Sequence, residues 1–435
     1  MRYQSNITFD SIEKYRKRYL KNKEKQKNNL SFKEESIEDL AFQTEEAARY
    51  PFSFSVDLPT RDPISQGLTG RCWLFAGVNF LMEKATEYIS KGNLPEDFRF
   101  STAYLSFWDK MEKANCFLEK MIHYRSCKAD KRELFSWLQY GITDGGFWTY
   151  FTDLVEKYGV IPECIMPETK KSSDTEELNR LLNHYLRKTA ADIRNAYVSN
   201  DSLEELYIIK DTALDKIYTF LCRYYGSPPQ QFSLGFKQYT PNSLRKEVIG
   251  NYTDDFISVI SLPYESLPLG EYCRLTDVFQ VNGMHEELFL NLPLDEMKKF
   301  CVKQLKAGIP VVCTADDSKM LREELQLWDD GSFDYERITG LEFSMSRKDY
   351  FRLKEGSVCH SMIITGVNLS GNDLPDRWKI KNSYGADGMH RGYYTCSDTW
   401  FDKYMVGAVI HKDYLKDYRE LIHTSPNPFY IWDIL

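Results

Sequence analysis

The stretch 66–76, with the sequence QGLTGRCWLFA, limits what this chain can fold into more than any other segment. A loop with two glycines leads into a cysteine, and that cysteine opens an apolar run with helical spacing. A helix N-terminus carries partial positive charge and stabilises a thiolate, which is the reactive form of cysteine. Cys72 is therefore a candidate nucleophile at the start of a buried helix. A buried core cysteine is the plainer interpretation, so the hypothesis requires a histidine and an asparagine elsewhere in the chain.

Both residues occur in two consecutive predicted strands near the end of the chain. His360 opens an apolar, β-branched run, and Asn382 ends a second alternating run after a turn-rich loop. We expect an antiparallel hairpin centred on Gly371, in which His360 and Asn382 stand directly opposite each other with Cβ atoms roughly 4.5–5.5 Å apart. The carboxamide could then orient the imidazole, unless a bulge shifts the register. A structural histidine and a turn asparagine are the alternatives, but the order Cys, His, Asn favours a site.

Several motifs resemble one known family. The run 70–76 has a glycine two residues before the cysteine and an aromatic residue after it, which is the papain-type signature. The runs 155–162 (VEKYGVIP), 166–169 (MPET) and 382–385 (NSYG) add to it. Together they resemble the bleomycin hydrolase and aminopeptidase C family of papain-like cysteine peptidases, over about residues 50 to 433. Tyr384 departs from the usual tryptophan, which should weaken the apolar shielding of the His–Asn hydrogen bond.

The resemblance implies a role for each residue of the predicted site. Cys72 would be the nucleophile, His360 its base, and Asn382 the group that holds the imidazole ring. Gln66 would supply its side-chain amide to an oxyanion hole together with the backbone N–H of Cys72. This chemistry needs no metal or cofactor, and we expect none.

The resemblance also predicts how a peptide would lie in the site. Gly145 and Gly146 come just before a predicted helix, and in papain-like peptidases such a pair lets the substrate backbone approach the main chain of the enzyme. Two glycines in a mere turn are the alternative. In aminopeptidases of this family a C-terminal arm lies in the cleft and its terminal carboxylate meets the amino group of the substrate. Here that arm would end at Leu435, which is a shorter arm than usual.

The fold that the resemblance implies is α+β, a papain-like two-lobe fold with a helical lobe, an antiparallel sheet lobe and large helical insertions. We expect an N-terminal helical arm over residues 1–50 and the helical lobe with the nucleophile over 51–169. A helical insertion, and candidate oligomerisation element, would occupy 170–250. The β-rich lobe with the histidine, the asparagine and the C-terminal arm would span 251–435.

Composition limits the partners. The net charge of −8 gives no overall attraction to phosphate backbones. A basic run in residues 14–27 is followed by an acidic block, which favours a solvated helical arm over a nucleic-acid patch. Ten cysteines stand singly, without a Cys-x-x-Cys pair, and no apolar run predicts a membrane span or signal peptide. We expect a cytoplasmic protein with reduced thiols, peptide substrates and a homo-oligomeric state, a hexamer by resemblance, with no membrane or nucleic-acid partner.

The segment 285–289 (HEELF) lacks the second histidine of a metalloprotease helix and is interpreted as a helix start. The function predicted from these features is that of a cysteine aminopeptidase acting on peptides. An oligopeptidase or endopeptidase of the same family stays open because the C-terminal arm is short. An inactive peptidase-like assembly or a nucleic-acid-binding protein is the alternative of a different class.

Overall fold

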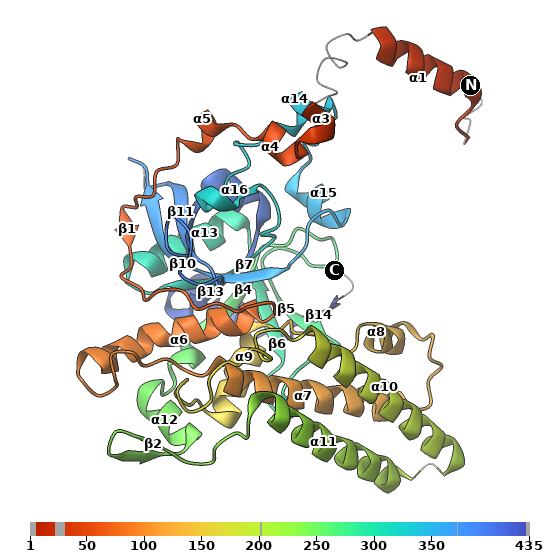
Figure 1. The fold of residues 1–435 in the computed structure, drawn as a ribbon, viewed down its shortest axis with the longest axis vertical. Helices are drawn as coiled ribbons and strands as arrows, with labels where there is room; N and C mark the ends of the chain where they lie inside the picture. Colours follow the sequence, from red (N-terminus) through yellow and green to blue (C-terminus); the bar gives the residue numbers. More distant parts are fainter. Residues whose placement is uncertain (1–5, 22–30, 201, 372, 432–435) are drawn as a thin grey trace.

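The computed structural model describes residues 6–21, 31–200, 202–371 and 373–431 (Figure 1). The predicted arm end at Leu435 lies outside these residues, as do positions 22–27 of the basic run. The first part of the described chain is helical: α1 (Phe9–Lys21), α3 (Ser31–Glu34), α4 (Ile37–Ala41), α5 (Thr44–Ala47), α6 (Cys72–Ser90), α7 (Thr102–His123), α8 (Arg132–Tyr140), α9 (Trp148–Tyr158), α10 (Glu176–Ser199), α11 (Leu203–Tyr225) and α12 (Pro241–Val248). Within this part lie the short strands β1 (Val56–Asp57), β2 (Phe232–Leu234) and β3 (Lys237–Tyr239).

The second part is rich in strands. These are β4 (Phe256–Ile260), β5 (Glu271–Thr276), β6 (Glu287–Asn291), β7 (Val311–Ala315), β8 (Leu321–Arg322), β9 (Leu327–Trp328), β10 (His360–Leu369), β11 (Pro375–Lys381), β12 (Tyr393–Ser397), β13 (Met405–His411) and β14 (Asn427–Tyr430). The helices between them are α13 (Leu294–Lys306), α14 (Tyr335–Thr339), α15 (Arg347–Arg352), α16 (Asp398–Tyr404) and α17 (Arg419–Ile422).

All strands except β2 and β3 form one 12-stranded sheet with the order β14-β5-β6-β4-β13-β7-β10-β11-β12-β9-β8, and β1 pairs with β10. Most pairs are antiparallel, while β4–β6, β5–β14 and β9–β12 are parallel. The mixed architecture of a helical part and a largely antiparallel sheet confirms the predicted α+β class.

The central strands pack on helices at both faces. Along β10, Ile363 belongs to the core shared with α6, α7 and α9, whereas Met362 and Ile364 belong to the core shared with α13 and α16. This alternation follows from the two-residue period of a strand. Helix α6 is buried on all sides over its first two turns, as its uniformly apolar sequence requires, and it lies directly against the sheet (Figure 1). The N-terminus of α6 therefore faces the ends of β7 and β10.

Some predicted elements differ from the observed ones. The prediction of a helix start at 285–289 is wrong, because residues 287–291 form strand β6, which is buried at four of its five positions and pairs with β5. Pairing across the sheet outweighs the weak helical preference of the two glutamates. The hairpin β2–β3 interrupts the predicted helical insertion. The four-part domain division remains a prediction.

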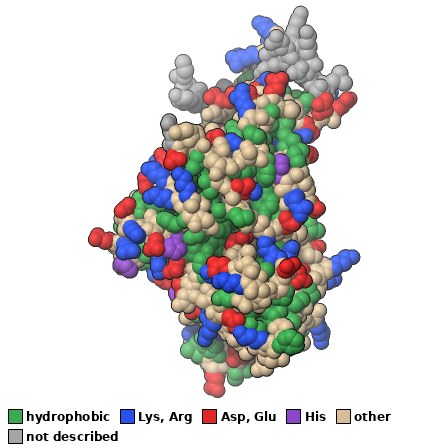
Figure 2. Space-filling view, turned by 90° about the vertical axis from the view of Figure 1, so that its left-hand side faces the viewer, with side chains coloured by type: hydrophobic (Ala, Val, Ile, Leu, Met, Phe, Trp, Pro, Cys, Tyr) green, Lys and Arg blue, Asp and Glu red, His purple; other side chains and the backbone are tan. Residues whose placement is uncertain are grey.

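Charged side chains of both signs are interspersed over the face shown in Figure 2, and no single-sign stripe runs across it. Within the described residues, no helix has both the length and the apolar character that crossing a bilayer demands. Helix α1 buries none of its side chains, in keeping with the solvated arm that its charges predict.

Candidate active site

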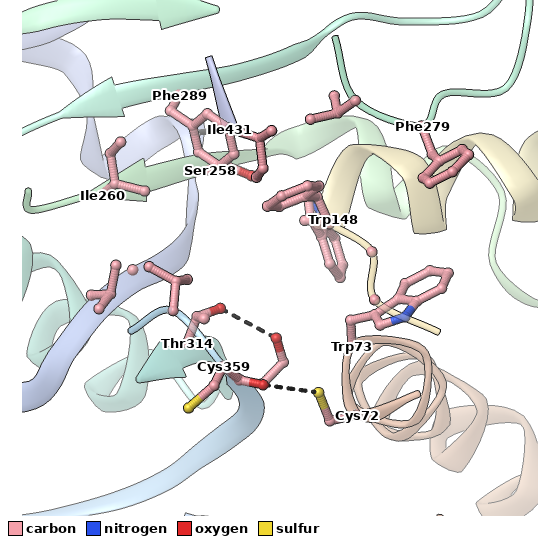
Figure 3. Close-up of a pocket in the computed structure, with 18 of the residues that line it drawn as sticks. Cys72, Trp73, Trp148, Ser258, Ile260, Phe279, Phe289, Thr314, Cys359 and Ile431 are labelled. Carbon is pink, nitrogen blue, oxygen red and sulfur yellow. Dashed lines mark hydrogen bonds between the residues drawn. The ribbon is translucent and has the colours of Figure 1, made fainter. Parts of the chain in front are cut away.

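Cys72 is the first residue of α6 and lines a cavity of about 430 Å³ between the helices and the sheet (Figure 3). Its side chain is 8% exposed, and Sγ lies 4.0 Å from the backbone oxygen of Cys359. The residue before it, Arg71, makes no side-chain hydrogen bond that would cap the helix. The first N–H groups of α6 therefore remain available to stabilise negative charge beside Cys72.

His360 begins β10 on the opposite wall, and Asn382 follows the end of β11. The imidazole is 6% exposed and the asparagine 1% exposed. Nε2 of His360 lies 2.7 Å from Oδ1 of Asn382, so the ring donates from Nε2. The backbone N–H of Ser383 donates to the same oxygen at 2.8 Å, which fixes the carboxamide. The structure thus brings together the three side chains that the sequence singled out.

The charge state of the imidazole follows from these neighbours. Burial disfavours the imidazolium, but hydrogen bonding and charge from Cys72 outweigh it, with smaller contributions from Asp317 and Asn382. The pKa of His360 is raised to about 9. At neutral pH the ring is therefore held as a cation beside the sulfur, which is the arrangement that favours a thiolate–imidazolium pair.

The predicted register of the hairpin is wrong by two residues. Ile363 pairs with Lys381 and Ile364 with Ile380, so the register is shifted by two residues from the predicted one and His360 does not stand directly opposite Asn382. Irregularities between Ile364 and Gly366, and between Asn368 and Leu369, shift the pairing along the strands. An offset of two residues keeps both side chains on the same face of the sheet, which is why the hydrogen bond still forms diagonally.

Gln66 lies in the loop before α6 and is 7% exposed. Its Nε2 donates to the backbone oxygen of Thr69 at 2.5 Å, and its Oε1 accepts a hydrogen bond from Ser383 at 2.5 Å. The amide group is therefore held between the nucleophile loop and the residue after Asn382. One of its two N–H bonds is used by Thr69, and the second remains for a ligand.

Gly145 and Gly146 line the cavity next to Trp73. A Cβ on Gly146 would lie 2.5 Å from Cε2 of the Trp73 indole, so only glycine fits there. A Cβ on Gly145 would meet only Oγ1 of Thr143, at 3.7 Å, so this position faces open space. The main chain at Gly145 is thus accessible to a peptide, as the motif predicts.

Most of the remaining cavity lining is apolar, and polar side chains interrupt it at Ser136, Thr143, Ser258, Asp277 and Thr314. Trp148, Ile260, Phe289 and Ile431 face into it from α9, β4, β6 and the residue after β14 (Figure 3). Such a lining with a few polar groups is typical of a site that binds a small or extended organic ligand.

Sequence reasoning missed a buried cluster of charges beneath this site. Asp109, Lys110 and Lys113 of α7 are fully buried, and Lys110 lies 2.5 Å from the carboxylate of Asp144. Lys113 donates to the backbone oxygen of Gly145 at 2.6 Å, and Asp144 accepts from the backbone N–H of Gly70 at 3.0 Å. The cluster therefore ties the glycine pair to the loop before Cys72. The adjacency of Asp144 to the two glycines was the available signal.

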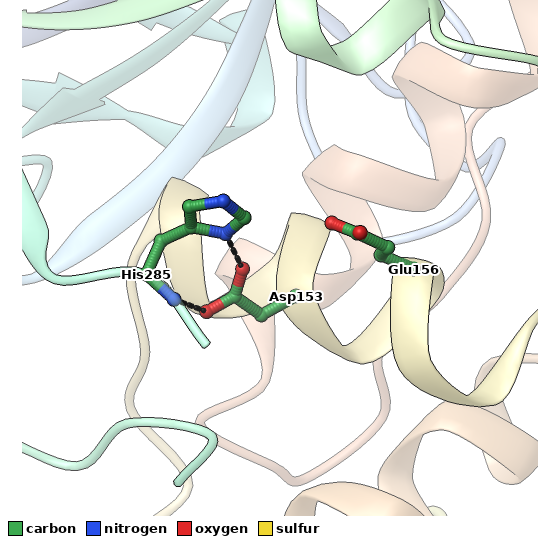
Figure 4. Close-up of side chains that lie close together, drawn as sticks. All are labelled: Asp153, Glu156 and His285. Atoms are coloured by element: carbon green, nitrogen blue, oxygen red, sulfur yellow. Dashed lines mark hydrogen bonds and ion pairs between the residues drawn. The ribbon is translucent and has the colours of Figure 1, made fainter. Parts of the chain in front are cut away.

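A second cluster lies away from the cavity. His285 Nδ1 is 2.6 Å from the buried carboxylate of Asp153, with Glu156 nearby on α9 (Figure 4). The hydrogen bond that the imidazole donates to Asp153 raises the pKa of His285. The His285 side chain is exposed whereas the Asp153 carboxylate is buried, and one potential ligand atom of each of Asp153, Glu156 and His285 lies within 4.8 Å of the others.

Comparison with known proteins agrees with this geometry. The model of the Peptidase C1-like family matches residues 6–435. The chain is 32% identical to aminopeptidase C of Lactococcus lactis subsp. lactis (strain IL1403), with 98% of each chain covered. It is also 32% identical to aminopeptidase G of Lactobacillus delbrueckii subsp. lactis, covering 89% of this chain and 90% of the relative. The crystal structure of pepw from Lactobacillus rhamnosis hn001 superposes with a TM-score of 0.92 at 29% identity, over 99% of both chains.

Proposed function

This chain belongs to the Peptidase C1-like family, and from that premise we propose that it is a papain-like cysteine aminopeptidase that removes residues from the amino terminus of peptides. The observation that carries the proposal is the hydrogen bond of His360 to Asn382 on one wall of the cavity, with Cys72 facing the imidazole from the other. The curated relatives are named aminopeptidases, which favours amino-terminal over internal cleavage.

In the proposed reaction the thiolate of Cys72 attacks the carbonyl carbon of the scissile peptide bond. The backbone N–H of Cys72 and the free N–H of Gln66 would donate to the oxyanion, and removing one such donor typically costs on the order of 10²–10³ in rate. His360 then gives its proton to the leaving amine, which leaves an acyl-enzyme. With the imidazole now neutral, it takes a proton from water, which attacks the thioester and releases the acyl product.

The buried neighbours of these groups support this sequence of steps. Asn382 keeps Nε2 of His360 engaged, so the other ring nitrogen is the one that exchanges a proton with the sulfur. Gly145 offers an accessible backbone for pairing with the substrate main chain. The apolar walls described above can receive an apolar side chain of the substrate.

The proposal is tested with two matched fluorogenic substrates, an aminoacyl coumarylamide with a free amino group and the same compound acetylated on that group. We expect cleavage of the free-amine substrate only, and its loss after iodoacetamide treatment or in Cys72→Ser. Comparable cleavage of the acetylated substrate would show an endopeptidase instead. Absence of cleavage for both would overturn the enzymatic function and favour an assembly role.

We also propose that the chain forms a homo-oligomer, a hexamer by family resemblance, in a reducing compartment such as the cytoplasm. Exposed apolar side chains on α10 and α11 support the first part, since Val198 is 83% exposed and Ile208 is 59% exposed. The ten free cysteines support the second. Light scattering on the purified chain tests the assembly, and a monomer at micromolar concentration would contradict it.

A further inference from the structure

A carboxylate that the proposed mechanism does not use lies beside the imidazole. Asp317 follows β7, and the antiparallel register pairs Ala315 at the end of β7 with His360. This pairing places Asp316 and Asp317, which follow Ala315, near the imidazole of His360. Oδ2 of Asp317 lies 3.8 Å from Nε2 of His360, and its side chain is 14% exposed.

Several contacts hold this carboxylate in place. The hydroxyl of Tyr384 donates to Oδ2 at 3.3 Å, and the thiol of Cys359 donates to Oδ1 at 3.4 Å. The indole N–H of the buried Trp328 donates to the backbone oxygen of Asp317 at 3.0 Å. The position of the carboxylate is therefore fixed from three sides by groups outside its own turn.

The adjacent aspartate has a different task. Asp316 is fully buried, and its carboxylate accepts from the Tyr350 hydroxyl at 2.6 Å and from the Ser357 backbone at 3.1 Å. Asp316 thus stabilises the loop before His360 through Tyr350 and Ser357, whereas the carboxylate of Asp317 lies next to the imidazole.

Tyr384 links Asp317 to the ring a second time. Its side chain stacks on the imidazole with ring centroids 5.3 Å apart and an interplanar angle of 27°. Burial, followed by the charge of Asp317, raises the pKa of the Tyr384 phenol, so its hydroxyl stays protonated and donates to the carboxylate. The tyrosine that replaces the usual tryptophan therefore shields one face of His360 and also orients Asp317.

We propose that Asp317 is a fourth functional residue of this site, a positioning residue whose negative charge keeps His360 protonated and whose bond to Tyr384 holds the aromatic cover over the ring. This inference rests on the proposed peptidase function, because it concerns the same imidazole. It names a residue that neither the Cys–His–Asn order nor the asparagine motif predicts.

The other groups that face the imidazole define what Asp317 adds. Cys72 approaches from α6, Asn382 from the end of β11 and Tyr384 from the loop after it, while Cys359 precedes His360 on the chain. Burial raises the pKa of Cys359 to about 11, so that thiol is neutral near pH 7. Besides the sulfur of Cys72, Asp317 is therefore the charged neighbour that favours the imidazolium, in the part of the chain that the structure describes.

The test uses Asp317→Asn, which keeps the shape and the acceptor for Tyr384 but removes the charge. We expect the alkaline limb of the kcat/KM profile to fall by about one pH unit, as for an opposite charge removed at this distance, while activity at pH 6 stays within about threefold of wild type. Tyr384→Phe keeps the stacked ring and the carboxylate, to which Cys359 still donates, so it should move the limb by less than Asp317→Asn does. Glu355→Gln removes the partner of Lys319 in an exposed ion pair in the same region and serves as the matched control.

A readout that needs no turnover separates this inference from the proposed function. Histidine side-chain NMR follows the titration of His360, whose signal is assigned by its loss in His360→Gln. We expect the midpoint of that signal to fall by about one pH unit in Asp317→Asn and to stay constant in the control. An unchanged midpoint, or an equal shift in Tyr384→Phe, would overturn the role of the Asp317 charge even if the enzyme cleaves peptides.

Discussion

Replacement of Asp144 by asparagine should destabilise this protein more than an isosteric change normally does. Four donors converge on the carboxylate. Lys110 and Asn179 donate to Oδ1 at 2.5 and 2.8 Å, and the Gly70 backbone and Thr175 donate to Oδ2 at 3.0 and 2.5 Å. An asparagine amide would point its NH₂ group at two donors in either orientation, so no rotation of the side chain restores the network.

The magnitude follows from the burial of the pair. Lys110 is fully buried and would keep only Asp109, at 3.6 Å, as a counter-ion. Breaking a buried ion pair by removing one partner costs about 3–5 kcal/mol. With a urea slope of roughly 3 kcal/mol/M, the midpoint of unfolding should fall by about 1 to 1.7 M. The control Asp192→Asn removes an exposed partner of Lys188 on α10 and should leave the midpoint unchanged.

The effect has a defined pH dependence. Burial alone would raise the pKa of Asp144, but Lys110 and the hydrogen-bond donors hold it well below its ordinary value of 3.8. A depressed carboxyl pKa contributes stability that is present above the unfolded value and is lost as the pH falls toward the folded value. Wild type and variant should therefore differ fully at pH 7 and converge only below about pH 4. If the free energy of unfolding of the variant lies within about 1 kcal/mol of the wild-type value at pH 7, this reasoning is refuted, because breaking a buried ion pair costs several times more.

Three further predictions test the site itself. Asn382→Ala removes the hydrogen-bond acceptor of the imidazole and should lower kcat/KM by about 10–10²-fold, since a hydrogen bond to a charged group contributes about 1.5–3 kcal/mol. Circular dichroism checks that the variant is folded, and an unchanged kcat/KM would argue against the assigned role. In Gly145→Ala the new methyl group faces open space, so the substitution should raise KM at constant stability. In Gly146→Ala the methyl group collides with the Trp73 indole, which should cost about 1–3 kcal/mol of stability. Thermal melts and Michaelis kinetics separate the two variants, and identical behaviour would contradict the assigned geometry. Because its pKa is raised to about 9, His360 stays protonated at neutral pH, so kcat/KM should be constant there and decline as the pH rises through about 9. A decline near the ordinary pKa of histidine would contradict the pairing with Cys72.

The local sequence predicts the elements that carry the site. Cys72 begins its helix where the apolar run begins, and the side chain of Ser101 caps α7 by accepting from the Tyr104 backbone. Gly159, with a φ of 75°, ends α9. These features depend on contacts within a few residues, which is why the sequence shows them.

Long-range features were harder to predict. The two-residue error in the hairpin came from irregular pairing that no local pattern marks. Lys110 and Lys113 look like the polar face of a helix in sequence, yet both are fully buried, because their partners come from a loop about thirty residues further on. Asp317 escaped notice for the same reason, since only the pairing of β7 with β10 brings it to His360.

The most direct test of the central claim is whether Cys72 and His360 act as one catalytic unit. Hydrolysis of the free-amine substrate is measured in Cys72→Ser, in His360→Ala and in the double variant. We predict that each single change lowers kcat by several orders of magnitude and that the double variant loses little more, as in other nucleophile–base pairs. Losses that multiply in the double variant, or a single variant within tenfold of wild type, would contradict the account.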